Sequence, residues 1–587
     1  MLSNISYLLL HYAYFSVFLC AFFGIGHYLL IQVLKLETDD TVLGTTLAIA
    51  VGQGMFIVLL QFLAVGGVLN SNWLSVFLAS SCLLAIREIN RSSLTPLMSL
   101  KRTWSGLTRS EVLGLAFILV FAFPTLLEPL RPPWPGDELQ YHLPHAQQWA
   151  LSGKLTINEW LRYPWFPYNY NLLYASAYVV YGDVFTHMFN ALAGCLIAIM
   201  IYRLGRRHFN HVVACVATFI WFQMNRREFG KTNVDMGTSL YALAASFTLF
   251  WWMKAPKDRR WLAVSAFLIG VAVGTKYQAL FFLPLFGLAV LWIDRRPSTV
   301  LIATISFLTP CIYWYARNAF MTGDPFDPIG GKVFGFTDWN LADYIAQFED
   351  LKRVAAWPPI IIWPSAFALW HLKGPRNSIR FGAVVLCSYF FIVWMFTSHY
   401  PRYLMPVVPW MALLAAENWS NTYKFIGNRL TAALSESKLK ILINILWVVI
   451  FISAALSCVS FSQTYWEYIS PSQDKRNILM RKEIKGYAVL EYANLHQLGR
   501  IYNVGLSDAV YYAPHPIWGD VFGPWRYPDI ISDEPLKFFN ELRKRNFDAV
   551  IVDQRMALAL ESSPFFSEYF SIAFESDGIK LYRVEKH

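Results

Sequence analysis

Long apolar runs, separated by short polar segments, fill the chain from its start to about residue 462. The runs are about 17–25 residues long, the length that crosses the hydrocarbon core of a bilayer as an α-helix. They are continuous rather than alternating, which indicates helices and not a β-barrel. We therefore predict an all-α polytopic membrane protein with about 14 transmembrane helices. The predicted spans are residues 7–34, 43–68, 72–87, 110–130, 183–203, 211–224, 236–253, 261–275, 277–293, 298–316, 356–371, 381–397, 403–417 and 441–462.

Basic residues set the orientation of these spans, because cytoplasmic loops carry an excess of Lys and Arg. With the spans above, the basic segments all fall on one side, which we predict to be cytoplasmic. These segments are residues 87–109, 203–207, 254–260, 294–296, 373–380 and 424–440. The same count places the following segments outside: residues 131–182, 225–235, 276, 317–355, 399–403 and everything after 462.

Composition agrees with a membrane protein and narrows the function. Hydrophobic residues make up 56% of the 587 residues and charged residues only 15%, whereas a soluble protein carries nearer a quarter charged. The net charge of +10 is what basic cytoplasmic loops produce, so no nucleic-acid partner is expected. All 7 cysteines fall in predicted spans and none forms a CxxC pair, so we expect neither disulfides nor a cysteine metal site.

The chain changes character after about residue 463, where charged residues become ordinary in frequency and apolar runs shorten. Residues 500–505 and 547–553 have the pattern of short buried strands, and residues 533–546 between them have helical spacing. Residues 579–584 fit a final strand. Strand, helix and strand in this order predict a small α/β domain on the outer face.

The external segment 131–182 differs from the other loops because it is long, aromatic, proline-rich and polar. It carries the adjacent acids Asp137 and Glu138, followed by Tyr141 and His142. Orientation puts three further sites at span boundaries on the same face, so we expect two acids and two cations to converge there. These sites are Asp235, Lys276 and the segment His399–Tyr403, which contains Arg402.

Each of these residues also has an ordinary structural interpretation. Asp137 and Asp235 both precede a predicted helix and could cap it. Lys276 could extend its ammonium group to the headgroup level, and Arg402 could anchor a helix end. Histidines such as His142 are more often structural than metal ligands, and no HExxH-type spacing occurs. The aromatic residues of the loop fit an interfacial belt.

The combination nevertheless favours chemistry at the membrane surface. A carboxylate beside a hydroxyl can accept its proton as a general base. Arg and Lys suit a phosphate, Arg as a two-pronged donor and Lys as a point charge. Acids with phosphate-binding cations at a membrane face fit group transfer from a lipid-linked phosphate donor.

Four segments resemble motifs of bacterial integral-membrane glycosyltransferases of the GT-C fold. Relatives of these enzymes include the protein O-mannosyltransferases and the aminoarabinose transferase of lipid A. The first segment resembles the Asp-x-x-x-Tyr-His-Leu motif of the first external loop. The segments, in the family's order, are Asp137–Pro144, Lys231–Met236, Gly274–Tyr277 and Tyr400–Pro406.

The resemblance implies a polyprenyl-phosphate sugar donor, displaced in one inverting step by a hydroxyl of a lipid, glycan or protein acceptor. Asp137 would be the general base, with Glu138 beside it as the alternative, and Asp235 the second acid. Lys276 and Arg402, with His399 nearby, would hold the lipid phosphate. Tyr141, His142, Lys231 and Tyr403 would bind substrate. Some members use a divalent metal at such acids and others do not, so we assign no metal ligand.

The implied organisation has three parts in the bacterial inner membrane. Residues 1–109 form an N-terminal transmembrane extension, residues 110–462 the catalytic domain with external loop 131–182, and residues 463–587 a periplasmic α/β domain. Two rival functions remain. A transporter or flippase of lipid-linked sugars would place ionisable residues deep within spans. A non-catalytic envelope glycan assembly factor would use the outer domain to bind a partner.

Overall fold

The structure is a computed structural model of the chain. It describes residues 2–585 except residues 92–107, 159, 332–348, 350–351, 354–356, 374–378, 398, 431–435, 507, 514–516, 521–529 and 557–558.

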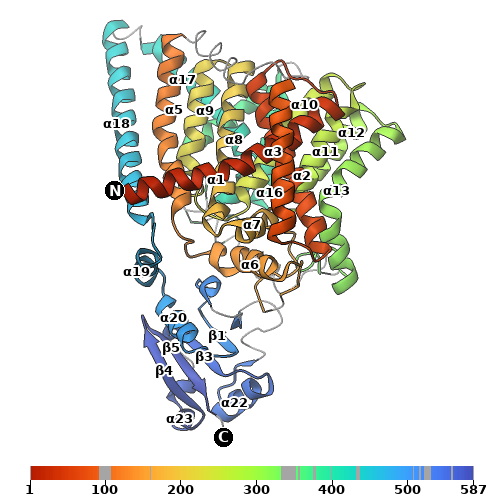
Figure 1. Ribbon diagram of the computed structural model, residues 1–587. Helices are drawn as coiled ribbons and strands as arrows, with labels where there is room; N and C mark the ends of the chain where they lie inside the picture. The colour runs from red at the N-terminus through yellow and green to blue at the C-terminus, as the bar shows by residue number, and fades with distance from the viewer. Residues whose placement is uncertain are drawn as a thin grey trace.

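Helices form a bundle in the first four-fifths of the chain (Figure 1). Every predicted span coincides with a helical element, and seven described helices are by themselves long and apolar enough to cross a membrane. One predicted span, residues 356–371, falls on a 3₁₀ helix that begins at Ile360 rather than on an α-helix, and its first residue lies outside the described residues. The elements are α1 (Leu2–His27), η1 (Tyr28–Val33), α2 (Thr41–Val65), α3 (Ser71–Arg91), α5 (Arg109–Leu127), α8 (Val184–His208), α9 (His211–Asn225), α10 (Asp235–Lys254), α11 (Arg259–Val273), η4 (Tyr277–Phe281), α12 (Phe282–Ile293), α13 (Pro297–Thr322), η6 (Ile360–Lys373), α16 (Ile379–Met395), η7 (Pro401–Leu404), α17 (Val408–Leu430) and α18 (Glu436–Tyr468).

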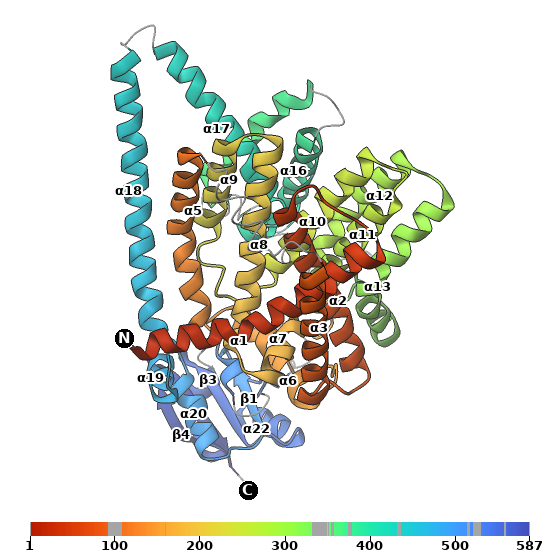
Figure 2. The ribbon, with the colours of Figure 1, turned by 45° about the horizontal axis from the view of Figure 1, so that its top comes forward.

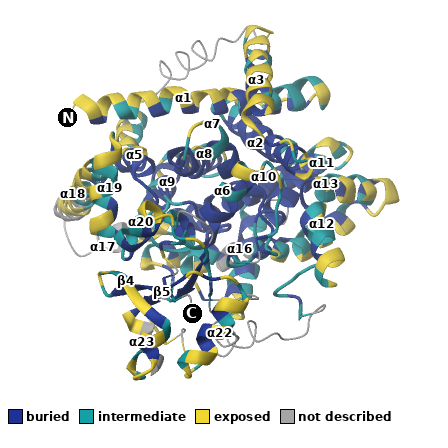
Figure 3. Ribbon diagram, turned by 60° about the horizontal axis from the view of Figure 1, so that its bottom comes forward, coloured by how far each residue is buried: buried dark blue, intermediate teal, exposed yellow. Residues whose placement is uncertain are grey.

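The chain is a multi-pass membrane protein, and its outer helices show the lipid-facing surface. Helix α1 crosses the outside of the bundle obliquely, and α18 stands at its edge beside α5 (Figures 1 and 2). Exposed apolar side chains cover α18, among them Ile445, Leu456 and Val459. An apolar surface of this extent is stable against lipid and not against water. Figure 3 shows the opposite pattern inside, where α7 (Asn169–Val180), α8 and α10 are buried.

Ion pairs join the chain segments at one end of the bundle. Arg203 pairs with Asp40 at 2.8 Å, and Arg206 pairs with Glu111 at 2.8 Å. Arg260 donates to the Leu34 carbonyl at 2.9 Å. Two of the segments that orientation placed on the cytoplasmic side, residues 203–207 and 254–260, therefore lie at a common end with residues 34–40 and Glu111.

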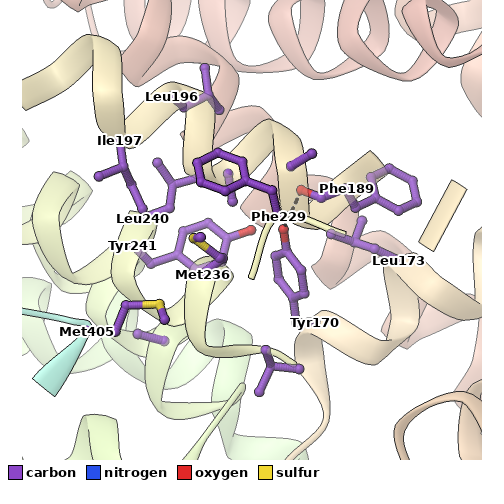
Figure 4. Close-up of a cluster of buried hydrophobic side chains, with 14 of the residues drawn as sticks. Tyr170, Leu173, Phe189, Leu196, Ile197, Phe229, Met236, Leu240, Tyr241 and Met405 are labelled. Atoms are coloured by element: carbon purple, nitrogen blue, oxygen red, sulfur yellow. Dashed lines mark hydrogen bonds between the residues drawn. The ribbon is translucent and has the colours of Figure 1, made fainter. Parts of the chain in front are cut away.

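The core of the bundle lies where α7, α8 and α10 pack together (Figure 4). Tyr170 and Tyr241 are fully buried there, and the Tyr170 hydroxyl donates to the Phe189 carbonyl at 2.8 Å. Met236 and Met405 also enter this cluster. Because Met236 follows Asp235 and Met405 lies three residues after Arg402, the core fixes the backbone beside two of the predicted site residues.

Segment 131–182, which orientation predicted to be external, folds back against the bundle. It contains a π-helical turn, η3 (Glu138–His142), and two α-helices, α6 (Leu143–Ser152) and α7. Helix α7 is buried over most of its length and packs against α2 and α8. The loop is therefore part of the folded bundle.

The C-terminal region forms a five-stranded sheet with strand order β2-β1-β3-β5-β4. β1 and β3 pair in parallel, whereas β5 runs antiparallel to β3. The predicted strands near 501, 549 and 579 and the helix between the first two are confirmed. β2 was missed because it has two residues, and β4 because only one of its seven residues is buried. The elements are α19 (Gln473–Glu483), α20 (Tyr487–Leu495), β1 (Ile501–Val504), β2 (Ile517–Trp518), α22 (Pro535–Lys544), β3 (Ala549–Asp553), α23 (Phe566–Tyr569), β4 (Phe570–Ser576) and β5 (Ile579–Val584).

Candidate functional site

Asp137 lies at a sharp turn that begins the π-helical element η3. The preceding Gly136 has φ +121°, a backbone conformation that L side chains rarely adopt, so glycine is needed there. Asp137 then has helical backbone angles and makes no side-chain cap hydrogen bond. The carboxylate is therefore free of the helix-capping role that the sequence left open for it.

Asp137 pairs instead with Arg402, whose Nη2 lies 2.7 Å from Oδ2. Burial raises the pKa of Asp137, but the opposing charges of Arg402, His142 and Lys276 outweigh burial and lower that pKa below its usual value. The Asp137 carboxylate is consequently ionised at neutral pH, which is the state that a general base requires.

Asp235 and Lys276 form a second ion pair, with Lys276 Nζ 2.6 Å from Asp235 Oδ1. Asp235 is the first residue of α10, and Lys276 lies in the break between α11 and η4. The backbone of Lys276 is extended, so the helix α11 does not continue through this break. The backbone of Asn169 fixes the same break, because its N–H donates to the Gly274 carbonyl at 2.8 Å.

Tyr403 joins the two ion pairs into one cluster. Its ring centroid lies 4.6 Å from Lys276 Nζ and 5.7 Å from the Arg402 guanidinium carbon. Cations over a tyrosine ring gain electrostatic stabilisation from its π face. The structure therefore brings together two acids and two cations at one end of the bundle, as the sequence predicted.

The two pairs of this cluster differ in access. The Asp137 and Arg402 side chains are 25% and 30% exposed, whereas those of Asp235 and Lys276 are 6% and 18% exposed. Equal numbers of positive and negative charges make the cluster neutral overall. A phosphate that enters must therefore compete with a carboxylate for a cation, and Arg402 is the more accessible of the two.

Glu138 lies in a different environment, although it is the next residue after Asp137. Its buried carboxylate accepts hydrogen bonds from the Trp134 N–H at 2.7 Å, the Thr232 N–H at 2.9 Å and His187 Nε2 at 2.9 Å. Burial raises the pKa of Glu138, but His187, Arg131 and these hydrogen bonds lower it below its usual value. Glu138 thus ties together three segments of the chain.

The remaining predicted site residues, which are Tyr141, His142, His399 and Lys231, make their described hydrogen bonds, ion pairs and ring contacts with residues other than the four charged members of the cluster. Tyr141 is buried and packs against Tyr163 at 4.7 Å, and His142 Nδ1 lies 3.3 Å from the Asn171 amide oxygen. His399 Nε2 lies 2.9 Å from the Met395 carbonyl. Lys231 pairs with Glu228 at 2.6 Å and makes no described contact with Asp137 or Asp235. Among the described residues, no group of three His, Cys, Asp or Glu side chains forms a metal-binding arrangement.

Several organising residues were not predicted from the sequence. His187 holds Glu138. Asn169 links the loop to the Lys276 break through its backbone N–H and to the Pro310 carbonyl of α13 through its side-chain amide. Their partners are distant in sequence and no local motif marks them. Only the packing of α7 and α8 identifies these residues.

The C-terminal region contacts the loop on both sides of Asp137. Arg162 makes a two-pronged pair with Asp520, at 2.8 and 2.6 Å, and also bonds to Gln140. Gln140 in turn donates to Asp508. The Tyr512 hydroxyl donates to the Pro133 carbonyl at 2.9 Å. The α/β region is therefore anchored on the loop that carries Asp137.

Family models match two parts of the chain. The model described as Dolichyl-phosphate-mannose-protein mannosyltransferase matches residues 177–314, which include Asp235 and Lys276. A model described as SF2091/S2213 matches residues 475–583, the C-terminal region.

Two Shigella flexneri proteins are similar in sequence. Uncharacterized protein SF2092/S2214 is 27% identical over 146 residues, 23% of this chain and 79% of that protein. Uncharacterized protein SF2093/S2215 is 35% identical over 75 residues, 13% of this chain and 37% of that protein.

Solved structures of ArnT from Cupriavidus metallidurans share the architecture. The structure bound to undecaprenyl phosphate has a TM-score of 0.51 at 14% identity and covers 80% of this chain and 97% of that chain. The apo structure has a TM-score of 0.50 at 15% identity with the same coverage. The chain thus has the GT-C fold of membrane glycosyltransferases.

Proposed function

We propose that this GT-C protein transfers a sugar from a polyprenyl-phosphate donor to an acceptor hydroxyl at the outer face of the bacterial inner membrane. The observation that carries the proposal is the cluster of Asp137, Arg402, Asp235 and Lys276 around Tyr403. It combines an ionised carboxylate with two cations at the end of the bundle where the external loop folds. The undecaprenyl phosphate in the ArnT structure supports a lipid phosphate as the donor's leaving group.

Donor binding begins with exchange of partners at Arg402. The lipid phosphate takes the place of the Asp137 carboxylate on the guanidinium, which forms two parallel hydrogen bonds to a phosphate. Lys276 adds a point charge from the adjacent position over Tyr403. Loss of the Arg402 partner raises the pKa of Asp137 and makes the carboxylate a stronger base. Donor binding and activation of the base are thereby coupled.

Sugar transfer then proceeds as a single displacement. Asp137 accepts the proton of the acceptor hydroxyl as that oxygen bonds to the anomeric carbon from the face opposite the phosphate. The bond between the anomeric carbon and the phosphate oxygen breaks, and the electron pair leaves with the lipid phosphate. Arg402 and Lys276 stabilise the charge that develops there. The anomeric configuration is inverted, and Asp235 holds Lys276 in place.

The chain's other parts support this reaction. In this proposal, residues 110–462 are the catalytic unit, residues 1–109 extend it in the membrane, and residues 463–587 form a periplasmic unit. Asp508 and Asp520 of the C-terminal region contact the loop that carries Asp137, and in this proposal the acceptor approaches Asp137 from that side. The acceptor is a hydroxyl of a lipid, glycan or protein.

The test is transfer of labelled sugar from synthetic polyprenyl-phosphate sugars in proteoliposomes of the full chain. We expect a product with inverted anomeric configuration and release of the lipid phosphate. Proteoliposomes with Asp137→Asn serve as the control. Movement of intact donor across the bilayer without cleavage of the sugar–phosphate bond would support the transporter instead and refute the proposal.

A further inference from the structure

A cavity of about 620 Å³ lies at the opposite end of the bundle from Asp137. Its walls come from the end of η1, the start of α11 and the start of α13. Helix α11 ends just before Lys276, and the far end of α13 reaches the outer loop through the bond from Asn318 to the Trp165 carbonyl. The cavity is therefore at the predicted cytoplasmic end. Its lining residues are Leu34, Lys257, Asp258, Arg259, Arg260, Ala263, Arg296 and Ile302.

Positive charge is in excess in this lining. The four cationic side chains face a single lining carboxylate, Asp258, which pairs with Arg260. Asp294 pairs with Arg296 at 2.7 Å and lies 3.6 Å from Arg259. These two acids leave an excess of two positive charges. Lys257 makes no hydrogen bond or ion pair with any residue that the structure describes, so its ammonium group is available for an anion.

The cations are held in place before any ligand arrives. Arg260 bonds to both carboxylate oxygens of Asp258 and to the Leu34 carbonyl. Arg259 donates to the Ser298 hydroxyl at 2.8 Å. Fixed guanidinium groups lose little side-chain entropy on binding an anion. The cavity volume also lies within the range of about 300–1,000 Å³ that is usual for small-molecule sites.

The remaining lining is apolar and continues onto the lipid-facing surface. Leu34, Ala263 and Ile302 form the apolar wall. Along α13, the side chains of Leu301 and Ile305 are each 58% exposed, and Trp292 at the end of α12 is 80% exposed. A ligand with an anionic head and an apolar tail matches both surfaces, whereas a free anion matches only the first.

We propose that this cavity binds the phosphate headgroup of an anionic membrane phospholipid, with an acyl chain along α13. Basic pockets between membrane helices at the cytoplasmic surface suit such headgroups, because the surrounding leaflet is anionic. The site is separate from the outer cluster and independent of the reaction proposed there. It gives the protein a specific lipid ligand in the inner leaflet.

Binding of fluorescent phosphatidylglycerol to the purified full chain in neutral detergent tests this proposal. Phosphatidylcholine with the same label is the comparison ligand. We expect saturable binding of phosphatidylglycerol only, weakened about fivefold by Lys257→Gln and by Arg296→Gln. Arg295→Gln is the matched control, because it removes one charge from the neighbouring position, is exposed and does not line the cavity.

The possible outcomes distinguish a specific lipid-binding site from nonspecific attraction of the lipid to surface charge. Equal weakening by Arg295→Gln, or equal binding of the two lipids, would refute the proposal. Displacement of the lipid by micromolar inorganic phosphate or glycerol 3-phosphate would show that the site recognises a free anion and would refute the lipid assignment. Lys257→Gln keeps the test valid if Arg296→Gln misfolds, because Lys257 is exposed and unpaired among the described residues.

Discussion

The ion pairs beside the inner cavity and those of the outer cluster are built in different ways. At the inner end, Asp258 pairs with Arg260 and Asp294 with Arg296, each two residues away, and these arginines are 47% and 61% exposed. At the outer end, Asp137 and Arg402 are 265 residues apart, and Asp235 and Lys276 are 41 apart. Local sequence creates these two pairs beside the inner cavity, whereas only the fold creates the two pairs of the outer cluster. The inner end also has pairs between distant residues, Arg203 with Asp40 and Arg206 with Glu111. We propose a chemical role for the outer pairs because they bring two acids and two cations together around Tyr403.

The largest expected effect is at Asp137. Replacement by Asn keeps the size of the side chain and removes the base, so we expect transfer to slow by about 10²–10⁴-fold. Asp258→Asn removes a carboxylate from an inner pair and should leave the rate unchanged. Initial rates of transfer in proteoliposomes, normalised to folded protein, measure both. An equal loss in the two variants would remove the distinction between the two ends.

Glu138→Gln should affect stability more than chemistry. Glutamine has an NH₂ group where the carboxylate has a second oxygen. This NH₂ group would face an N–H group that now donates to the carboxylate, so at least one buried donor would lose its acceptor. We expect a loss of about 2–4 kcal/mol in the free energy of unfolding. Thermal unfolding in detergent measures this loss. A variant that unfolds at the wild-type temperature yet transfers no sugar would show that Glu138 is the base.

Removal of a phosphate-binding cation should raise the donor KM. Arg402→Gln and Lys276→Gln each delete one charge at the lipid phosphate, and we expect KM for the donor to rise about 10–100-fold. Arg260→Gln is the matched control at the inner end, where a cation is lost from an exposed pair. If the outer variants lowered kcat alone and left KM unchanged, the cations would not bind the ground-state donor.

Acid should inactivate the wild type only at low pH. The pKa of Asp137 is below its usual value, so the carboxylate stays ionised, and kcat/KM should fall only as pH drops through this lowered pKa. The ion pair stabilises the fold above the unfolded-state pKa of about 3.9, and this contribution is lost over the same acidic range. In Arg402→Gln, less positive charge opposes the effect of burial, so the pKa of Asp137 is higher. The acid limb of the kcat/KM profile should therefore move up by about one pH unit. An unchanged limb would show that another group titrates.

The sequence was enough to predict the membrane helices and the convergence of the site, because span length and basic loops depend on local composition, but it did not predict α6 and α7 within the loop. Orientation predicted that Asp137, Asp235, Lys276 and Arg402 lie at one end of the bundle. It could not separate Asp137 from Glu138, since the difference lies in the positions of His187, Trp134 and Thr232. The contacts of the C-terminal region could not be predicted from the sequence either, because no motif marks Asp508 or Asp520 as partners of the loop.

Donor binding by Asp137→Asn is the most direct test of the division of roles within the outer cluster. The measurement is the Kd of a labelled polyprenyl-phosphate sugar for the wild type and for this variant in the same proteoliposomes. If the cations bind the phosphate and Asp137 acts only as the base, the variant binds the donor at least as tightly as the wild type, because Arg402 is no longer occupied by a carboxylate. A loss of donor binding as large as the loss of transfer would contradict that division and make Asp137 part of the donor site.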